Sequence, residues 1–561
     1  MKEFRCFGPP GTGKTSRLAT RDVPRAVEKY GPDKVMITSF TKAAAREIAT
    51  KKSRKTGRPI DVDPENVGTL HAICFRALKE PKIIEKDKEL IAEWNSRHKA
   101  LIIKEPGKST LDDVYAGEAE LVHNGDVMLN RLNIARNKMI KPTGDVAHFE
   151  KIWTQFKQET GSVDFTDLIE TAIRKMPYAP GNPEVFFVDE AQDFTKLQLT
   201  LVRSWAQQMQ WLVLVGDDDQ SLYHFAGALP DAFLNPPIDQ KFKTILKQSY
   251  RVPAAVLVKA NELIEKVSQR EPKTYRPRVD NITGNIVKGI VTPGQFTWRK
   301  PDSSIKLIQD YMADGKTVMI LASCSYMLTP TKNILRQYKI PFHNPYRQTR
   351  GDWNPLGSRR GATSSAQLLS NFIETGLDDS YWNIPQLVSW AKFIKVGEYG
   401  LIKKQGKAGI KALEQAIENS ADGLHTSRDV LAQILSPAAI QPALNRNVDW
   451  LLDNLLATRR KSIEFVVGVY KNYGIDAINN PPQVVIGTIH SVKGGEADVV
   501  ILFPDISYEA NQEFHKSVHG RDSVFRMFYV GMTRARETLI VANPSHRGAF
   551  MKAENYIDLK V

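Results

Sequence analysis

The feature that most constrains this chain is the segment GPPGTGKT near its start. A short run with apolar character, Glu3–Phe7, precedes it, and a helix-compatible stretch, SRLATRDVPRAVEKY, follows it. Strand, glycine-rich loop and helix in this order predict a loop whose backbone N–H groups surround a phosphate at the positive end of the helix. In such a loop Lys14 reaches the β- and γ-phosphates of a nucleotide, and the Thr15 hydroxyl binds Mg²⁺. The residues expected to form this site are Gly8, Pro9, Pro10, Gly11, Thr12, Gly13, Lys14 and Thr15.

Two further apolar runs end in polar side chains. Glu184–Val188 is followed by Asp189 and Glu190, and Trp211–Val215 is followed by an acidic turn that ends in Gln220. Such runs are typical of buried parallel strands, whose carboxyl ends meet at one edge of a sheet. We therefore expect Asp189 to bind Mg²⁺, Glu190 to deprotonate the attacking water, and Gln220 to sense the γ-phosphate. The alternative, that the two carboxylates only begin a helix, is disfavoured by the intact phosphate loop.

The composition favours a polyanionic partner in a reducing compartment. The 561 residues include 77 Lys and Arg against 63 Asp and Glu, a net charge of +14. Such an excess suits nucleic-acid phosphates, although a basic solvated surface is an alternative. The three cysteines, Cys6, Cys74 and Cys324, have no Cys-x-x-Cys spacing that would indicate zinc or iron–sulfur ligation. No signal peptide or bilayer-spanning run is recognised, so we expect a cytoplasmic protein with no membrane partner.

Four later blocks complete a recognisable series: GDDDQSLYHFAGA, LKQSYR, GTIHSVKGGEADVV and YVGMTRAR. With them, the chain resembles the UvrD/PcrA/Rep-type superfamily 1 helicases over most of residues 1–80, 165–345 and 480–545. The resemblance implies an α/β fold of two RecA-like P-loop motor domains, each a parallel sheet flanked by helices with a mainly helical insert, and ATP bound between them. The expected bounds are 1–80 and 165–248 for the first motor domain, 81–164 for its insert, 249–345 and 479–561 for the second motor domain, and 346–478 for its insert.

The resemblance also implies that the second motor domain completes the ATP site. Arg251 and Arg534 would stabilise charge on the transferred phosphoryl group, Tyr250 would stack on adenine, and Glu496 would contact the ribose. If both arginines reach the γ-phosphate only when the domains close, hydrolysis is coupled to domain movement. The expected catalytic residues are Lys14, Asp189, Glu190, Gln220, Arg251 and Arg534.

A strand-tracking protein needs flat side chains for bases and hydroxyl groups for phosphates. The resemblance implies single-stranded DNA and its junctions with duplex as partners of a monomeric motor, and the QSLY block followed by an aromatic is similar to the 3′→5′ branch. RNA is an alternative strand, and each aromatic is equally suited to an apolar core. The expected strand contacts are Phe40, Thr41, Thr69, His71, Tyr223, Phe225, Thr488 and His490.

The chain departs from the family pattern at several positions. No glutamine that could read adenine precedes the phosphate loop, which leaves the preference for ATP over other nucleotides open. Lys42 and Ala43 replace an Asn-Lys pair, and Gly495 replaces a leucine. The chain ends at Val561, soon after GMTRAR, so we do not expect functions that depend on the longer C-terminal extension of some relatives.

The second insert carries basic stretches of its own. It opens with YRQTRGDWNPLGSRRG at Tyr346–Gly361 and continues as helices such as Val448–Tyr473. Ala457–Ser462 (ATRRKS) and the glycine-containing turn Leu401–Gly409 are both basic. Contacts to duplex phosphates are one interpretation of this turn, and a solvated helix end is the other. The lysines of the turn are Lys403, Lys404 and Lys407.

Three functions are compatible with these residues. The first is a DNA-stimulated ATPase that moves along single-stranded DNA and unwinds duplex. The second is a translocase that strips proteins from DNA with little unwinding. The third is a P-loop switch without motor activity, which would need neither Arg251 nor Arg534.

Overall fold

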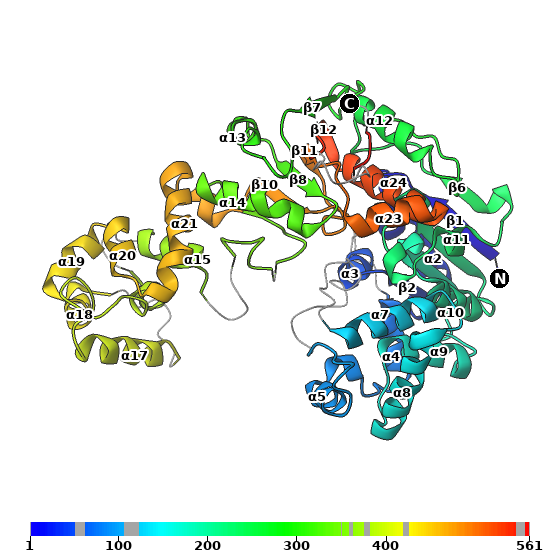
Figure 1. Ribbon diagram of the computed structural model, residues 1–561, viewed down its shortest axis with the longest axis horizontal. Helices are drawn as coiled ribbons and strands as arrows, with labels where there is room; N and C mark the ends of the chain where they lie inside the picture. The colour runs from blue at the N-terminus through cyan, green and yellow to red at the C-terminus, as the bar shows by residue number, and fades with distance from the viewer. Residues whose placement is uncertain are drawn as a thin grey trace.

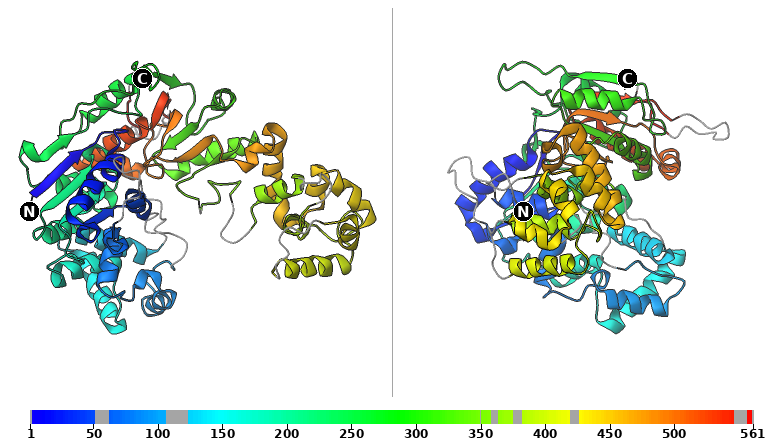
Figure 2. Two further views of the ribbon diagram at one scale, coloured as in Figure 1. Left: turned by 180° about the vertical axis from the view of Figure 1, so that it is seen from behind. Right: turned by 90° about the vertical axis from the view of Figure 1, so that its left-hand side faces the viewer.

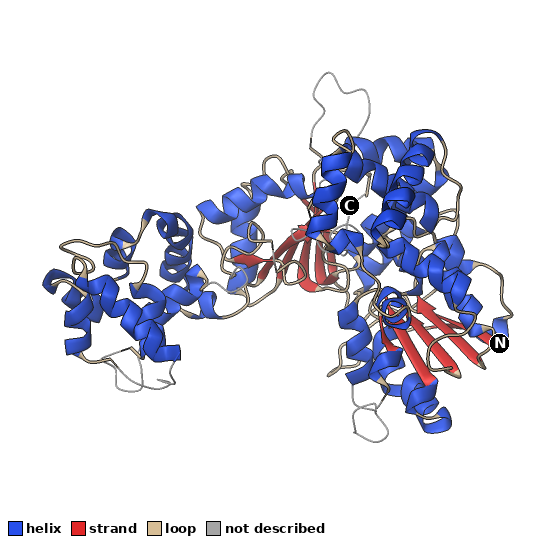
Figure 3. Ribbon diagram, turned by 90° about the horizontal axis from the view of Figure 1, so that it is seen from below, coloured by secondary structure: helices blue, strands red, loops and turns tan. Residues whose placement is uncertain are grey.

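The computed structural model describes residues 2–50, 62–105, 123–348, 350–357, 363–374, 382–418, 426–545 and 556–559. The described strands form two six-stranded sheets in which every strand pair is parallel, as expected (Figure 3). Residues 349 and 358–361 of the basic loop predicted at 346–361, and residues 106–122 of the first predicted insert, lie outside the described residues.

The first sheet has the strand order β3-β2-β4-β5-β1-β6. Its helices cover both faces, and the phosphate loop joins β1 to the first helix. The strands are β1 (Lys2–Phe7), β2 (Val35–Ser39), β3 (Val67–Gly68), β4 (Val185–Asp189), β5 (Trp211–Gly216) and β6 (Lys243–Ile245). The helices are α1 (Lys14–Arg17), α2 (Val23–Tyr30), α3 (Lys42–Thr50), α4 (Leu70–Ala77), α9 (Phe165–Lys175), α10 (Lys196–Ala206) and α11 (Pro230–Leu234).

The central strands β4 and β5 of the first sheet are apolar along nearly their whole length, as expected of strands covered on both faces. In β4, Phe186 and Val188 pack into one apolar cluster, and Val185 and Phe187 pack into another on the opposite face. The alternation is the two-residue period of a strand between two helical layers. Because these strands are parallel, the polar residues that follow each strand lie at one edge of the sheet.

Three helices, α5 (Lys88–Arg97), α7 (Asn124–Asn137) and α8 (Gly144–Thr160), belong to the first insert. They lie together beside α4 and α9, where Figure 1 labels them, and Figure 2 shows the same blue and cyan group from behind. Trp94 and Trp153 are fully buried in an apolar cluster that contains only insert residues. This insert therefore has a core of its own.

The second sheet has the strand order β7-β12-β11-β8-β10-β9. The final helix α24 runs directly into β12 through Thr533 and Arg534. The strands are β7 (Ile290–Gly294), β8 (Val318–Ala322), β9 (Phe342–His343), β10 (Val484–Thr488), β11 (Ala497–Leu502) and β12 (Ala535–Ala542). The helices are α12 (Ala254–Ile264), α13 (Ser304–Ala313), α14 (Thr329–Gln337), α22 (Asp476–Asn479), α23 (Tyr508–Lys516) and α24 (Val518–Met532).

The second insert is helical and extends away from both sheets, with α15 and α21 connecting its outer helices to the second sheet (Figure 1). Unlike the first insert, it shares one continuous apolar cluster with the sheet, which joins Ile320 of β8 to Trp390 and Trp450 of the insert. Its helices are α15 (Ser365–Ile373), α16 (Ile384–Ala391), α17 (Gln405–Glu418), α18 (Arg428–Ile434), α19 (Pro437–Leu444), α20 (Val448–Asn454) and α21 (Ala457–Tyr473).

Two details of the second insert differ from the sequence interpretation. The helical stretch predicted at 448–473 is two helices, because the backbone leaves the helical region at Leu455 (ψ 151°) and Leu456 (ψ 140°), between α20 and α21. The basic turn predicted at 401–409 ends early, since α17 begins at Gln405 and includes Lys407. Within the described ranges, no helix is long and apolar enough to cross a bilayer.

Candidate functional site: a nucleotide site shared by two sheets

The phosphate loop has the strand, loop and helix geometry that its sequence predicts. β1 ends at Phe7, Gly13 adopts a left-handed conformation with φ 75°, and α1 begins at Lys14. The Lys14 ammonium donates a 2.8 Å hydrogen bond to the Gly8 carbonyl, and the Thr12 hydroxyl donates one of 2.7 Å to the Pro9 carbonyl. The ammonium therefore lies over the loop, where a phosphate would be held.

Thr15 and Asp189 are brought together at the carboxyl edge of the first sheet. The Thr15 hydroxyl donates to Asp189 Oδ2 at 2.9 Å, and Asp189 Oδ1 is buried without a hydrogen-bond partner. Burial and the neighbouring Glu190 carboxylate raise the pKa of Asp189 to about 7. A hydroxyl beside a buried carboxylate with an unsatisfied oxygen is a donor set that fits Mg²⁺, which prefers oxygen ligands and takes few of them from the protein.

Glu190 adopts a left-handed backbone conformation, with φ 52° and ψ 41°. Its carboxylate accepts a 2.5 Å hydrogen bond from the Gln192 amide. Burial alone would raise the pKa of Glu190, but the positive charges of Lys14, Lys493 and Arg534 and the hydrogen bond from Gln192 together outweigh burial and lower that pKa to about 2. Glu190 is therefore ionised and able to accept a proton.

The chain that leaves the first sheet after β6 lies directly on the phosphate loop. The Ser249 hydroxyl donates to the Pro10 carbonyl and the Tyr250 backbone N–H donates to the Gly11 carbonyl, both at 2.8 Å. Gly11 has φ +72°, and a Cβ on it would lie 2.5 Å from the Arg251 Cβ, so a side chain cannot fit there. The Tyr250 side chain is 62% exposed beside this contact.

The side chain of Arg534, which follows α24 in the second domain, reaches the turn that ends in Gln220 in the first domain. Its guanidinium is 1% exposed and donates to the side-chain oxygen of Gln220 at 3.2 Å. It also donates to the carbonyls of Val530 and Gly495, at 2.9 and 3.1 Å. All three acceptors are neutral, and burial lowers the pKa of Arg534 to about 9. Arg534 is therefore a buried cation between the two sheets that donates only to neutral oxygens.

Arg251 and Glu496 form an ion pair in this conformation. Arg251 Nε lies 2.7 Å from Glu496 Oε2, and Arg536 Nη1 lies 2.9 Å from Glu496 Oε1. The carboxylate therefore lies between two guanidinium groups.

Sequence reasoning did not assign Lys493, although it belongs to the KGGE block. Its ammonium forms an ion pair with the buried carboxylate of Asp193 and donates to the Gln220 carbonyl at 3.1 Å. It also lies 5.2 Å from the centroid of the Tyr223 ring. Lys493 thus contacts the first domain at three places: the turn that contains Asp193, the turn that ends in Gln220, and the Tyr223 ring.

Four of the expected strand-contact residues form a connected aromatic cluster across both sheets. Phe40 stacks on Tyr223 with centroids 4.6 Å apart, Tyr223 lies 6.1 Å from Phe225, and Phe225 lies 5.6 Å from His490. Tyr223 is only 7% exposed, so in this conformation its ring packs between neighbouring side chains. Phe40 and Phe225 are half-buried.

The three expected threonines share one local geometry. Each hydroxyl accepts a hydrogen bond from the backbone N–H three residues later, at 3.2 Å for Thr41, 3.3 Å for Thr69 and 3.1 Å for Thr488. Thr69 in this way caps the N-terminus of α4. Helix and turn starts of this kind present N–H groups that suit phosphate oxygens.

The two expected histidines are held neutral by their surroundings. Burial lowers the pKa of His71 to about 4, and burial also lowers the pKa of His490 to about 4. His71 lies edge-on to Phe165, with centroids 6.2 Å apart. At neutral pH either imidazole would contact a strand through hydrogen bonds or stacking and would not add positive charge.

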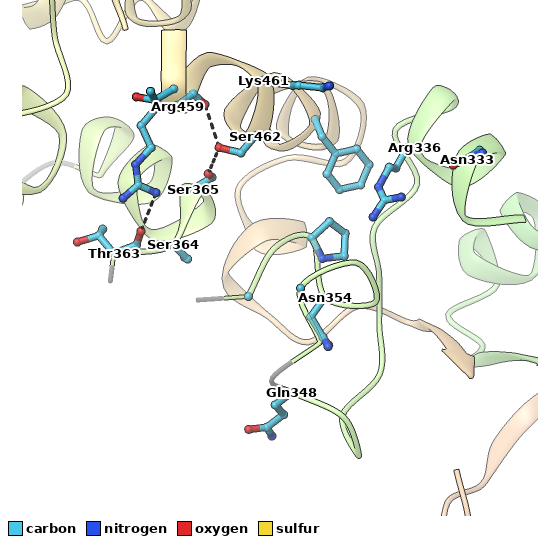
Figure 4. Close-up of a pocket in the computed structure, with 15 residues that line it drawn as sticks. Asn333, Arg336, Gln348, Asn354, Thr363, Ser364, Ser365, Arg459, Lys461 and Ser462 are labelled. Carbon is cyan, nitrogen blue, oxygen red and sulfur yellow. Dashed lines mark hydrogen bonds between the residues drawn. The ribbon is translucent and has the colours of Figure 1, made fainter. Parts of the chain in front are cut away.

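A basic groove of about 850 Å³ lies where the second insert meets the second sheet (Figure 4). Arg336 of α14 and two residues of the ATRRKS stretch, Arg459 and Lys461, line it, and its other described lining residues include no carboxylate. Ser365 and Ser462 hydrogen-bond to each other at 2.9 Å on one wall. The lysines of the 401–409 turn are exposed further out, at the start of α17.

These features define a P-loop nucleoside triphosphatase with two RecA-like domains, in which side chains of the second domain contact the polar turns of the first. Comparison with known proteins agrees with this class. The UvrD/REP helicase N-terminal domain matches residues 6–241, and the UvrD-like helicase C-terminal domain matches residues 483–542. The chain belongs to the UvrD/PcrA/Rep-like helicase family.

Curated relatives align with nearly the whole chain. The ATP-dependent DNA helicase PcrA of Staphylococcus epidermidis is 24% identical over 617 residues, which cover 97% of this chain and 82% of the relative. The ATP-dependent DNA helicase PcrA of Staphylococcus aureus has the same identity and coverage. The similarity therefore includes the regions that carry the inserts.

Proposed function

We propose that this chain is an ATP-driven motor that moves along single-stranded DNA and separates the duplex ahead of it. One observation carries the proposal. Arg534 and Lys493 of the second sheet contact Gln220 and Asp193 of the first, where the phosphate loop lies, so one nucleotide would be read by both domains. The staphylococcal relatives, named ATP-dependent DNA helicases, support ATP as the fuel and DNA as the polymer.

The hydrolytic step follows from the side chains at the edge of the first sheet. Lys14 would bind the β- and γ-phosphates, and Thr15 and Asp189 would hold Mg²⁺, which would neutralise phosphate charge. Glu190 orients the attacking water and accepts its proton. Arg534 contacts the γ-phosphate from the opposite domain and stabilises the charge that develops in the transition state.

Nucleotide binding would also rearrange the second domain. Arg251 leaves Glu496 for the γ-phosphate, and Glu496 becomes available to the ribose while Tyr250 stacks on the base. Each of these changes favours a closed pair of domains, and loss of the γ-phosphate removes that preference. The cycle of closing and opening is the source of movement.

The strand would lie across the cluster that contains Phe40, Phe225 and His490. Its phosphates would be held at the N–H groups beside Thr41, Thr69 and Thr488. Lys493 links this track to the nucleotide site, because it contacts both Tyr223 and Asp193. Nucleotide state would in this way change how each domain holds the strand.

The resemblance of the sensor block supports 3′→5′ movement of a monomeric motor. We assign the inserts a role at the DNA junction, where Lys403, Lys404 and Lys407 and the groove lined by Arg459 and Lys461 would contact duplex phosphates. The proposed bounds are those of the sequence analysis: motor domains at 1–80 with 165–248 and at 249–345 with 479–561, and inserts at 81–164 and 346–478.

The test measures ATP hydrolysis with single-stranded DNA, single-stranded RNA and blunt duplex, and unwinding of 3′- and 5′-tailed forks. We expect stimulation mainly by single-stranded DNA and unwinding of the 3′-tailed fork. The Glu190→Gln variant is the control, because it should bind the fork and nucleotide without turnover. Displacement of streptavidin without unwinding would identify a protein-stripping translocase, and hydrolysis indifferent to every oligonucleotide would contradict a motor.

A further inference from the structure

The segment 268–276 follows α12 in the second domain. It contacts both α24 of the same domain and the acidic turn at residues 217–220 of the first domain. On one side it is fixed to α24, the helix that leads into the proposed catalytic arginine. The Ser268 hydroxyl donates to Asp522 at 2.6 Å, and the buried hydroxyls of Tyr275 and Tyr529 hydrogen-bond at 3.1 Å. Both partners on α24 are themselves buried.

On its other side the segment inserts a buried cation into the acidic turn after β5. The side chain of Lys273 is 1% exposed, and its ammonium lies 3.2, 2.5 and 2.9 Å from oxygens of Asp217, Asp218 and Asp219. Arg270 adds two hydrogen bonds to Asp219, at 2.9 and 2.6 Å. Buried carboxylates of one turn are thus held by cations from another domain, an arrangement that fixes geometry because unpaired buried charges are costly.

Asp217 connects this ion cluster to Gln220. Asp217 Oδ1 faces the Lys273 ammonium, and Asp217 Oδ2 accepts a 2.6 Å hydrogen bond from the Gln220 amide nitrogen. The Gln220 amide oxygen in turn accepts from Arg534 at 3.2 Å. The reverse orientation of this amide would place oxygen against carboxylate and nitrogen against guanidinium, so Asp217 and Arg534 together select one orientation.

We propose that Asp217, held by Lys273, is a positioning residue for nucleotide hydrolysis. It acts by orienting the amide of Gln220 so that the amide oxygen faces Arg534, and the second amide hydrogen is left for the γ-phosphate. Because the segment that carries Lys273 is also bonded to α24, the same cluster fixes the sensor and the arginine relative to each other. The inference rests on the proposed function, since it concerns the same hydrolytic site.

Asp217→Asn is the informative perturbation. It preserves shape but replaces one carboxylate oxygen with an NH₂ group, and the Lys273 ammonium will attract the oxygen that remains. The NH₂ group then faces Gln220, whose amide must turn over and present its own NH₂ to Arg534. The result is a repulsive contact at the catalytic arginine within a fold that is otherwise intact.

Asp218→Asn is the matched control. It makes the same chemical change at the neighbouring residue and also removes one carboxylate from Lys273, but Asp218 does not contact Gln220. Burial raises the pKa of Asp218 to about 6, so the folded protein already disfavours the charge that this substitution removes. A merely structural role for the acidic turn would affect both variants alike.

The experiment compares wild type, Asp217→Asn and Asp218→Asn in ATP hydrolysis with saturating single-stranded DNA, in binding of a fluorescent ATP analogue, and in thermal unfolding. We expect Asp217→Asn to lower kcat by about tenfold, the effect of one misplaced hydrogen bond, with KM for ATP changed less than about twofold. Asp218→Asn should keep kcat within about twofold of wild type.

Equal kcat values for the two variants would overturn the inference, and so would an Asp217→Asn protein that is unfolded where Asp218→Asn is folded. The wild type separates this inference from the proposed function. Wild-type protein without DNA-stimulated hydrolysis refutes the function itself. Wild-type protein that hydrolyses ATP together with an equally active Asp217→Asn variant refutes only the positioning role.

Discussion

Replacing Arg534 with methionine should separate stability from turnover. The guanidinium is buried between the two sheets and donates only to neutral oxygens, those of Gln220, Gly495 and Val530. A buried cation that donates to no carboxylate is unfavourable, and a bound triphosphate would supply an anionic acceptor. Methionine has a similar length and no charge, so Arg534→Met removes the cost of burial together with the catalytic group.

The magnitude follows from the shifted ionisation of this side chain. A pKa lowered from 12.5 to about 9 corresponds, at about 1.4 kcal/mol per pH unit, to an upper limit of about 5 kcal/mol against the charged form at neutral pH. Loss of three hydrogen bonds from a charged donor offsets roughly 3 kcal/mol or more of this. Without nucleotide, the variant should therefore be as stable as wild type or slightly more stable.

The kcat for ATP hydrolysis should fall, although stability does not. Removal of an arginine that contacts the transferred phosphoryl group lowers kcat by about 10³-fold or more, which is about 4 kcal/mol in the barrier. The assays are steady-state ATP hydrolysis with saturating single-stranded DNA and thermal unfolding with and without a non-hydrolysable ATP analogue and Mg²⁺. The analogue should raise the apparent unfolding temperature of wild type more than that of Arg534→Met.

Two results would refute this reasoning. A nucleotide-free Arg534→Met protein that melts well below wild type would show that the guanidinium contributes net stability in the resting state. A variant that keeps kcat within about tenfold of wild type would show that Arg534 is not the group that stabilises the transition state. Arg536→Met is a useful control, because Arg536 pairs with the half-exposed carboxylate of Glu496.

Three further outcomes are expected. Glu190→Gln should bind ATP normally and hydrolyse it at least about 10²-fold more slowly, measured by equilibrium binding and steady-state turnover; wild-type rates would exclude Glu190 as the base. Charge reversal of Lys403, Lys404 and Lys407 together should weaken fork binding and reduce its dependence on salt, while the affinity for single-stranded DNA stays unchanged. If the salt slopes of the variant and wild type are identical, these lysines do not contact the duplex. Burial lowers the pKa of His71 from its usual value near 6.5 to about 4 in the folded protein, so acidification from pH 6.5 towards 4 protonates the unfolded chain first and destabilises the fold. The His71→Gln variant should therefore lose stability less steeply over that pH range. Denaturant titrations at several pH values would measure this difference.

Local motifs made most of the nucleotide site predictable. The phosphate loop, the apolar strand before Asp189 and the polar turn that ends in Gln220 each carry their geometry within a few residues. The sequence therefore indicates both the strand ends and the side chains that leave them. The fold class follows from the same runs, because strands buried on both faces are apolar throughout.

The contacts between domains were not predictable in this way. Lys493 and Asp193 are separated by 300 residues, and Lys273 and Asp218 by 55, with no periodic pattern that relates them. Such pairings arise only when the two sheets are placed together.

The break between α20 and α21 shows a second limit of sequence reasoning. Leu455 and Leu456 continue the apolar pattern of a helix and include neither glycine nor proline. Leu455 is nevertheless buried in an extended conformation, where its backbone bridges to Ile394. Tertiary packing decided the outcome at a position where local preference favours continuation.

The backbone at Glu190 has a practical consequence for engineering. A residue with a β-carbon held in the left-handed region costs about 1–2 kcal/mol relative to glycine, which adopts that region freely. A laboratory selection that rewards heat resistance alone would therefore favour glycine at position 190. Given the proposed role of Glu190 as the base, such a selection would return heat-stable proteins that no longer hydrolyse ATP, so the selection needs an ATPase assay alongside the stability screen.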